Sequence, residues 1–321
     1  MKILLVSDIH LNLSKEPEWE SNRFSELFKE LARASEDCDM TVLSGDIFDN
    51  PKPTLQEIHL FYSCLNYFKE PPIIIDGNHE CLDKQNYTWD FLPSGNFEYT
   101  PNKLIETKST NIYLCGHKKL YTLKYIRGDL KKKKNILITH VRSNVPPHIK
   151  EEFDCRFLSN TFDLVVSGDI HYRYSPFDNF HYLGQPYSTT YKPEVTNGYG
   201  ILDTDTLELS FVDLDLPSKI KIDVNVQDLN SLSLNQKNLY KLRVTGSIEE
   251  LHEVPNNNSN ILYEKVILTS EVQKTSTHIS EGKVDIVNTL IGLTKETFDL
   301  SEETVRKGEE IISGICSRYT N

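Results

Sequence analysis

Short apolar runs that stop abruptly in polar residues recur through the first half of the chain. Three of them, rich in leucine, isoleucine and valine, lie at 1–7, 40–44 and 73–75, and this pattern is typical of strands buried on both faces. Two segments with apolar residues at helical spacing separate them, at 24–31 and 55–68. This alternation predicts a parallel sheet whose strands all end at one edge.

The remainder of the first 216 residues is less regular. We expect Ser21 to cap the first helix, and Pro51 and Pro53 precede the second. Further strands are predicted at 111–115, 120–126, 135–139 and 162–167. Three short alternating segments with turn residues between them are expected to close the domain as antiparallel strands, and they lie at 180–183, 199–203 and 208–214.

After Pro217 the pattern changes to half-exposed alternation. Strands are predicted at 219–226, 239–244 and 261–268, with a short helix at 248–252, which together indicate a small α+β domain. Residues 281–321 have helical periodicity, with one apolar stripe at 284–291 and a narrow seam at 305–315. These stripes either fold back on the protein's own core or dock on a helix of a partner.

Composition adds few restrictions. The 321 residues are 38% hydrophobic and 26% charged, as in an ordinary globular protein, and no apolar run is long enough to cross a membrane. The six cysteines are scattered, with no Cys-x-x-Cys pair, and the chain starts with a strand pattern rather than a signal peptide. We therefore expect reduced thiols and a cytoplasmic location, in the host cytoplasm if the protein is viral.

Charge is distributed unevenly along the chain. The net charge of −12 argues against a partner as acidic as DNA, but residues 113–150 hold ten lysines and arginines against one acidic residue. This basic region could follow a phosphate backbone, or it could be a solvated turn between two strands. The pattern favours neither interpretation.

The polar residues at the strand ends carry the chemistry. They are Asp8 and His10, Asp46 and Asp49, Asn78 and His79, His140, and Asp169 and His171. In an extended Asp-x-His segment both side chains point the same way, so both can reach one cation. Oxygen and imidazole ligands without thiolates suit Mn, Fe or Zn and tolerate Mg. Each motif alone is a weak signal, but five in series indicate a site for two ions about 3.5–4 Å apart.

This series of motifs resembles the calcineurin-like metallophosphoesterase superfamily over residues 1 to about 171. The segments 182–187 and 197–203 are similar to the corresponding stretch of SbcD-type DNA nucleases, including the phage-encoded ones. The resemblance implies a four-layer α/β/β/α sandwich of two mixed sheets over 1–216, a capping domain over 217–280 and a helical tail over 281–321. In that subfamily the tail docks on an SbcC-type coiled-coil ATPase, and the resemblance implies a homodimer within a heterotetramer.

The resemblance also implies a role for each strand-end residue. Asp8, His10 and His171 would hold one ion, Asn78, His140 and Asp169 the other, and Asp46 would bridge them. His79 would protonate the leaving 3′-oxygen, with Asp49 behind it fixing its tautomer. Tyr172 and Arg173, which follow the last motif, are expected to touch substrate. Asn12 stands where the family often has glycine, and we expect this difference to affect a loop only.

One position departs from the family pattern in a way that bears on the metal. Asp169 stands where the family usually has histidine, and a carboxylate is a harder ligand than imidazole. If it binds, it favours Mn²⁺ or Mg²⁺ over Zn²⁺; the alternative is that it turns away and leaves a weak second site.

The sequence therefore predicts a metal-dependent DNA nuclease. The expected activities are exonuclease action on duplex DNA and endonuclease action on single strands or hairpins, in DNA repair, recombination or replication. Two alternatives remain: a phosphoesterase acting on nucleotides or phosphoproteins, and a weakly active scaffold for an ATPase partner.

Overall fold

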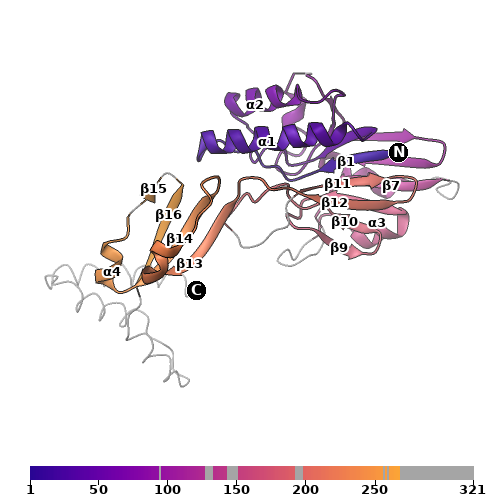
Figure 1. The fold of residues 1–321 in the computed structure, drawn as a ribbon. Helices are drawn as coiled ribbons and strands as arrows, with labels where there is room; N and C mark the ends of the chain where they lie inside the picture. The colour runs from indigo at the N-terminus through magenta and orange to yellow at the C-terminus, as the bar shows by residue number, and fades with distance from the viewer. Residues whose placement is uncertain are drawn as a thin grey trace, which may run out of the picture. The chain divides into compact units, whose positions relative to one another are not determined.

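The computed structural model describes residues 1–93, 95–126, 133–142, 151–191, 198–255, 257–258 and 260–267. Residues 1–266 form one compact unit, and Figure 1 labels several of its helices and strands. The predicted helical tail at 281–321 lies outside the described residues. Within the described part of the chain, no helix has the length and apolar character needed to cross a bilayer.

The first sheet has six strands in the order β12-β11-β1-β2-β3-β4. Strands β1 to β4 are parallel, whereas β11 and β12 are antiparallel additions beside β1. Its strands are β1 (Lys2–Val6), β2 (Met40–Ser44), β3 (Ile73–Ile75), β4 (Glu98–Tyr99), β11 (Gly198–Asp203) and β12 (Glu208–Asp213). Helices α1 (Pro17–Ser35) and α2 (Leu55–Leu65) connect β1 to β2 and β2 to β3, so the predicted strand–helix alternation is confirmed.

The second sheet also has six strands, in the order β5-β6-β7-β8-β10-β9. Strands β6, β7, β8 and β10 are parallel, with β5 and β9 antiparallel at the two edges. The strands are β5 (Asn102–Glu106), β6 (Thr110–Cys115), β7 (Lys134–His140), β8 (Leu164–Gly168), β9 (Tyr174–Phe177) and β10 (Phe180–Tyr182). Both large sheets are therefore mixed.

Alternation along the buried strands builds the layers. In β1, Ile3 and Leu5 face a core shared with the second sheet, which contributes residues such as Ile138. Leu4 and Val6 face the opposite way and pack against apolar residues of α1 and α2. The outer face of the second sheet packs against α3 (Cys155–Thr161) and the 3₁₀ helix η2 (His117–Tyr125). The result is the four-layer α/β/β/α sandwich that the sequence predicted.

Three local predictions were wrong. Residues 120–126 form part of η2 rather than a strand, because Leu120 and Leu123 lie one 3₁₀ turn apart and are both buried. The segment at 180–183 supplies β10, which runs parallel to β8 and antiparallel only to β9. Helix α1 begins at Pro17 instead of after Ser21, with proline in its first turn.

A smaller four-stranded sheet follows Leu216, in the order β13-β14-β16-β15. Its elements are β13 (Lys219–Asn225), η4 (Val226–Ser231), β14 (Leu239–Gly246), α4 (Ile248–His252), β15 (Asn257–Asn258) and β16 (Ile261–Ile267). Val224, Leu242 and Val244 form its core with Leu251 of α4. The three predicted strands and the short helix are present, and the domain boundaries at 217 and 281 stay predictions.

Candidate metal centre

The polar residues that follow β1, β2 and β3 meet His140, the last residue of β7, and the polar residues that follow β8. Parallel strands of both sheets end at this edge, so their C-terminal residues converge. Eight predicted residues lie there: Asp8, His10, Asp46, Asn78, His79, His140, Asp169 and His171. Three groups of side chains in this set have ligand atoms close enough to hold a metal ion.

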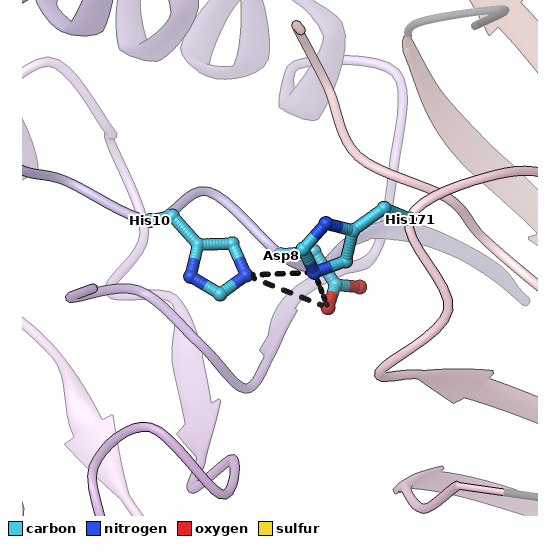
Figure 2. Close-up of side chains that lie close together, drawn as sticks. All are labelled: Asp8, His10 and His171. Atoms are coloured by element: carbon cyan, nitrogen blue, oxygen red, sulfur yellow. Dashed lines mark hydrogen bonds and ion pairs between the residues drawn. The ribbon is translucent and has the colours of Figure 1, made fainter. Parts of the chain in front are cut away.

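The first group comprises Asp8, His10 and His171 (Figure 2). The Nε2 atoms of His10 and His171 lie 3.0 Å apart, and the Oδ1 atom of Asp8 is 3.9 and 3.7 Å from them respectively. Two imidazole nitrogens and one carboxylate oxygen thus face one another across a small space. This donor set fits a divalent cation of the Mn, Fe or Zn type.

The second group comprises Asp8, Asp46 and His140, and the predicted ligands Asn78 and Asp169 lie beside it; His140 is fully buried. Its Nε2 lies 3.0 Å from Asn78 Oδ1, 3.3 Å from Asp46 Oδ2 and 4.0 Å from Asp169 Oδ1. On the other side of the ring, Nδ1–H donates a hydrogen bond to the Ser44 carbonyl oxygen over 2.9 Å. A carbonyl acceptor at Nδ1 leaves the Nε2 lone pair for a metal ion.

Two observations support cation binding at these groups. Asp46 Oδ2 lies 3.6 Å from His10 Nε2 and 3.3 Å from His140 Nε2, so one carboxylate oxygen faces both groups. The Oδ2 atom of Asp169 is buried and has no hydrogen-bond partner, although a buried oxygen of this kind normally has one. Both features fit a site built for positive charge.

His79 lies beside these groups at the mouth of the site, with 39% of its side chain exposed. Its backbone N–H donates to Asp46 Oδ1 over 2.9 Å, and its Nδ1 lies 2.8 Å from the Asp49 backbone carbonyl. The Asp49 carboxylate is more distant from His79, at 3.7 Å, and lies 3.3 Å from His10 Nδ1. Asp49 is thus next to His79, as predicted, but its carbonyl oxygen is the nearer acceptor. His79 also belongs to the third possible metal group, with His10 and Asp46.

Asn12 has more than a loop role, contrary to the expectation from the sequence. Its side-chain amide donates to Asp49 Oδ2 over 2.7 Å. Together with His10, it lowers the pKa of Asp49 and keeps that carboxylate ionised beside the metal groups.

Four of the converging residues adopt left-handed backbone conformations. The φ angles are 57° at Asp8, 51° at His10, 53° at Asp46 and 89° at Asp169. Such conformations cost about 1–2 kcal/mol for an L-residue. Hydrogen bonds between adjacent strand ends hold them, from Asp8 N–H to the Gly45 carbonyl and from His10 N–H to the Asp46 carbonyl. Strain of this kind is concentrated at functional sites.

Glu80 is the supporting residue that the sequence did not reveal. Its carboxylate is fully buried and accepts hydrogen bonds from the backbone N–H groups of Asp46, Ile47, Phe48 and Gly77. It therefore ties the turn after β2 to the turn after β3. Burial, together with the nearby Asp46 charge, raises the pKa of Glu80 to about 7. Backbone donors at a sharp buried turn need an acceptor, and this requirement is the signal that could have identified such a residue.

The charges in the site are strongly coupled. Burial raises the pKa of Asp8 to about 6 and lowers the pKa of His171 to about 4. Burial also raises the pKa of Asp46, but His140 outweighs this effect and holds that pKa far below its usual range. For His140 burial lowers the pKa, yet Asp46 and Asp8 hold it well above its usual value. A bound cation would replace these protons as the counter-charge.

The site opens on a cleft of about 540 Å³. Tyr172 lines this cleft beside His171, where the sequence placed a substrate contact. Arg173 points elsewhere: its guanidinium donates to Asp213 Oδ1 over 2.5 Å and lies over the Phe211 ring of β12. Its predicted substrate contact stays a prediction.

The described part of the basic region is largely paired within the protein. Lys118 forms an ion pair with Asp90 at 2.6 Å, and Lys133 lies 3.6 Å from Glu106. Residues 127–132 lie outside the described residues. For Lys118 and Lys133, the contacts favour a structural role over one in following a phosphate backbone.

The chain belongs to the calcineurin-like phosphoesterase family, whose family model matches residues 1–173. It is therefore a metallophosphoesterase, and the family resemblance inferred from the motifs is confirmed. Over 286 residues the chain is 29% identical to the probable exonuclease subunit 1 of Escherichia phage T5, covering 83% of this chain and 84% of that protein.

Solved structures with partial similarity were also found. One is an archaeal phosphodiesterase with 16% identity and a TM-score of 0.37. The match covers 67% of this chain and 100% of that one. Another is the TT1561 protein of Thermus thermophilus, with 13% identity and a TM-score of 0.42. The match covers 66% of this chain and 98% of that one.

Proposed function

We propose that this metallophosphoesterase is a DNA nuclease. It would hydrolyse phosphodiester bonds at the candidate metal centre, where the C-terminal ends of the β-strands converge. The observation that carries the proposal is the meeting of three possible metal groups with a partly exposed histidine at one cleft. The similarity to a phage protein named as a probable exonuclease subunit supports a polynucleotide as the substrate class. The proposed activities are duplex exonuclease and single-strand or hairpin endonuclease, in DNA repair, recombination or replication.

Two divalent ions would be held at the metal groups. Asp8, His10 and His171 would bind one ion, and Asn78, His140 and Asp169 the other. Asp46, whose Oδ2 atom faces both groups, would bridge them. When bound, the ions would neutralise phosphate charge and lower the pKa of water. With three carboxylates and an amide oxygen in the set, Mn²⁺ is the expected metal, and Mg²⁺ also fits.

His79 would move the proton that the leaving group needs. Its Nδ1–H can donate to the Asp49 carbonyl, which fixes the ring and leaves Nε2 to exchange a proton with the substrate. Because His79 lines the cleft, Nε2 can reach a substrate oxygen there. In the protonated form it would donate to the departing 3′-oxygen.

The test compares the wild-type protein with His79→Ala on end-labelled linear duplex DNA in Mn²⁺. We expect cleavage to fall by about 10²–10⁴-fold, the usual contribution of a general acid, with Mn²⁺ binding retained in calorimetry. His59→Ala, which removes an exposed histidine of α2, is the matched control and should cleave normally. If the wild-type protein hydrolyses a simple phosphomonoester briskly but never cuts DNA, the proposal is wrong and the protein is a phosphoesterase of another substrate class.

We also propose that the protein is the catalytic subunit of an SbcCD-like complex in the cytoplasm. In this proposal residues 1–216 are the nuclease domain, 217–280 the capping domain and 281–321 the segment that docks on an SbcC-type ATPase, with a homodimer at the centre. The word "subunit" in the name of the phage T5 protein supports an assembly. Co-purification of the chain with and without residues 281–321 tests it, since only the full chain should retain the ATPase.

A further inference from the structure

A buried ion cluster lies on the side of the cleft formed by α1 and the start of the small sheet. Arg23, Glu20 and Lys219 all line the same cleft as His79 and His171. The side chains of Arg23 and Glu20 are only 1% and 6% exposed, and that of Lys219 is 16% exposed. Since charged side chains are rarely this buried, the cluster calls for a physical explanation.

Arg23 is held by two aromatic rings and two hydrogen-bond acceptors, although its buried Nε has no hydrogen-bond partner. Its guanidinium lies between the rings of Trp19 and Tyr187, 4.3 and 3.9 Å from their centroids. One terminal nitrogen donates to the Ser188 carbonyl over 2.7 Å and the other to Glu20 Oε2 over 2.5 Å. These contacts hold the guanidinium in one orientation and, through it, the Glu20 carboxylate.

The other oxygen of Glu20 is used by Lys219, the first residue of β13. Lys219 Nζ lies 2.6 Å from Glu20 Oε1 and 3.4 Å from the Thr189 carbonyl, and 5.8 Å from the Trp19 ring centroid. An ammonium group has three donors, so these two acceptors leave one N–H for a ligand. Trp19 adds a second tie to the small sheet by donating from Nε1 to the Lys237 carbonyl over 2.7 Å.

The charges of this cluster do not balance. Among the described residues, Glu20 is the one carboxylate paired with Arg23 or Lys219, so two cations share a single anion. The excess positive charge lies in a cleft wall where water is partly excluded, so an anion bound there is attracted more strongly than at an open surface. A phosphate diester carries the single negative charge that this wall lacks.

We infer that Lys219, held by Glu20 and Arg23, binds a non-scissile phosphate of a polynucleotide strand whose scissile phosphate lies at the metal groups. The inference rests on the proposed nuclease function and makes Lys219 a specificity-determining residue. It follows that a substrate with a second phosphate gains from Lys219, whereas a substrate with a single phosphate does not.

The experiment compares Lys219→Gln with the wild-type protein on two substrates in Mn²⁺. Bis(p-nitrophenyl) phosphate has one phosphodiester, and a single-stranded oligonucleotide has many. We expect the KM for the oligonucleotide to rise about tenfold, as for the loss of one charge-assisted phosphate contact. The slope of log KM against log salt should fall by about 0.7. Hydrolysis of the small diester should be unchanged.

Two further variants separate charge from structure. Lys241→Gln makes the same substitution in the small sheet and breaks the 3.0 Å pair with Glu264, so it should leave both substrates unaffected. Lys219→Arg keeps the positive charge and should restore the oligonucleotide KM and the salt slope.

Equal losses on both substrates for Lys219→Gln, or an unchanged oligonucleotide KM, would overturn the inference. The failure of the proposed function looks different: the wild-type protein would then cleave the small diester and no polynucleotide at all. Thermal unfolding of each variant identifies any loss of activity that comes from misfolding. If Lys219→Gln is misfolded, the decision rests on whether Lys219→Arg keeps the wild-type slope of log KM against log salt.

Discussion

Replacing Glu80 by glutamine should damage the metal centre without removing any of its proposed ligands. The carboxylate accepts from Gly77 and Asp46 N–H at Oε2, over 2.7 and 3.0 Å, and from Ile47 and Phe48 N–H at Oε1, over 2.6 and 3.1 Å. A glutamine side chain has one acceptor oxygen, and its NH₂ group would face two of these donors. Each buried donor left unpaired costs about 1–3 kcal/mol, so we expect the free energy of unfolding to fall by about 2–6 kcal/mol.

The same change should loosen the Asp46 turn and weaken Mn²⁺ binding by about 10–100-fold, the usual effect of losing a partner that orients ligands. Chemical denaturation and calorimetric Mn²⁺ titration measure the two effects. Glu98→Gln, at a half-exposed ion pair with Lys103, is the control and should change stability by less than about 0.5 kcal/mol. If Glu80→Gln matches this control in both stability and Mn²⁺ affinity, the positioning role assigned to Glu80 is wrong.

Three other perturbations probe the site. Gly168→Ala would place a Cβ 1.8 Å from Ser7 Oγ and 2.6 Å from His140 Nδ1, so we expect a lower melting temperature and weaker Mn²⁺ binding, by scanning and titration calorimetry. Burial lowers the pKa of His140, but the Asp46 and Asp8 carboxylates raise it by more, so the net shift is upward. The stability this gives the metal-free protein is complete below the unfolded pKa of about 6.5 and lost as pH rises through the folded pKa, so melting in EDTA should occur at lower temperature at about pH 9 than at about pH 6. Asp169→His should raise the Zn²⁺-to-Mn²⁺ affinity ratio by about tenfold, measured by competition, and an unchanged ratio would show that Asp169 does not bind metal.

The residues that carry the chemistry were readable because each lies at the C-terminal end of a buried strand or in the turn that follows it. Apolar runs such as Ile73–Ile75 have one plausible environment, and the polar residues after them have one sheet edge to occupy. The convergence of His140 and Asp169 with Asp8 needed more than periodicity, because these residues lie on different sheets. Only the order of the motifs, through the family resemblance, indicated that the two sheets share an edge.

The sequence predictions failed where the local residue pattern and the tertiary contacts favour different structures. Leu120 and Leu123 fit a strand with interruptions as well as a 3₁₀ turn, and packing under the second sheet decided between them. Edge strand β9 has a proline and exposed tyrosine, so it gave no strand signal. Glu80 was visible as an acidic residue, but its four donors come from two turns that are about thirty residues apart in sequence. Such contacts are not encoded in spacing.

The distribution of the metal groups between the two sheets has a consequence for folding. Asp8, His10 and Asn78 follow strands of the first sheet, whereas His140 ends a strand of the second and Asp169 and His171 follow another. In the proposed assignment each ion takes ligands from both sheets, so the full affinity for metal would appear only once the sandwich has closed. An ion that binds the closed form and not the unfolded chain stabilises it in proportion to the logarithm of the metal concentration. Metal supply would then control how long this metallophosphoesterase survives in the cell as well as how active it is.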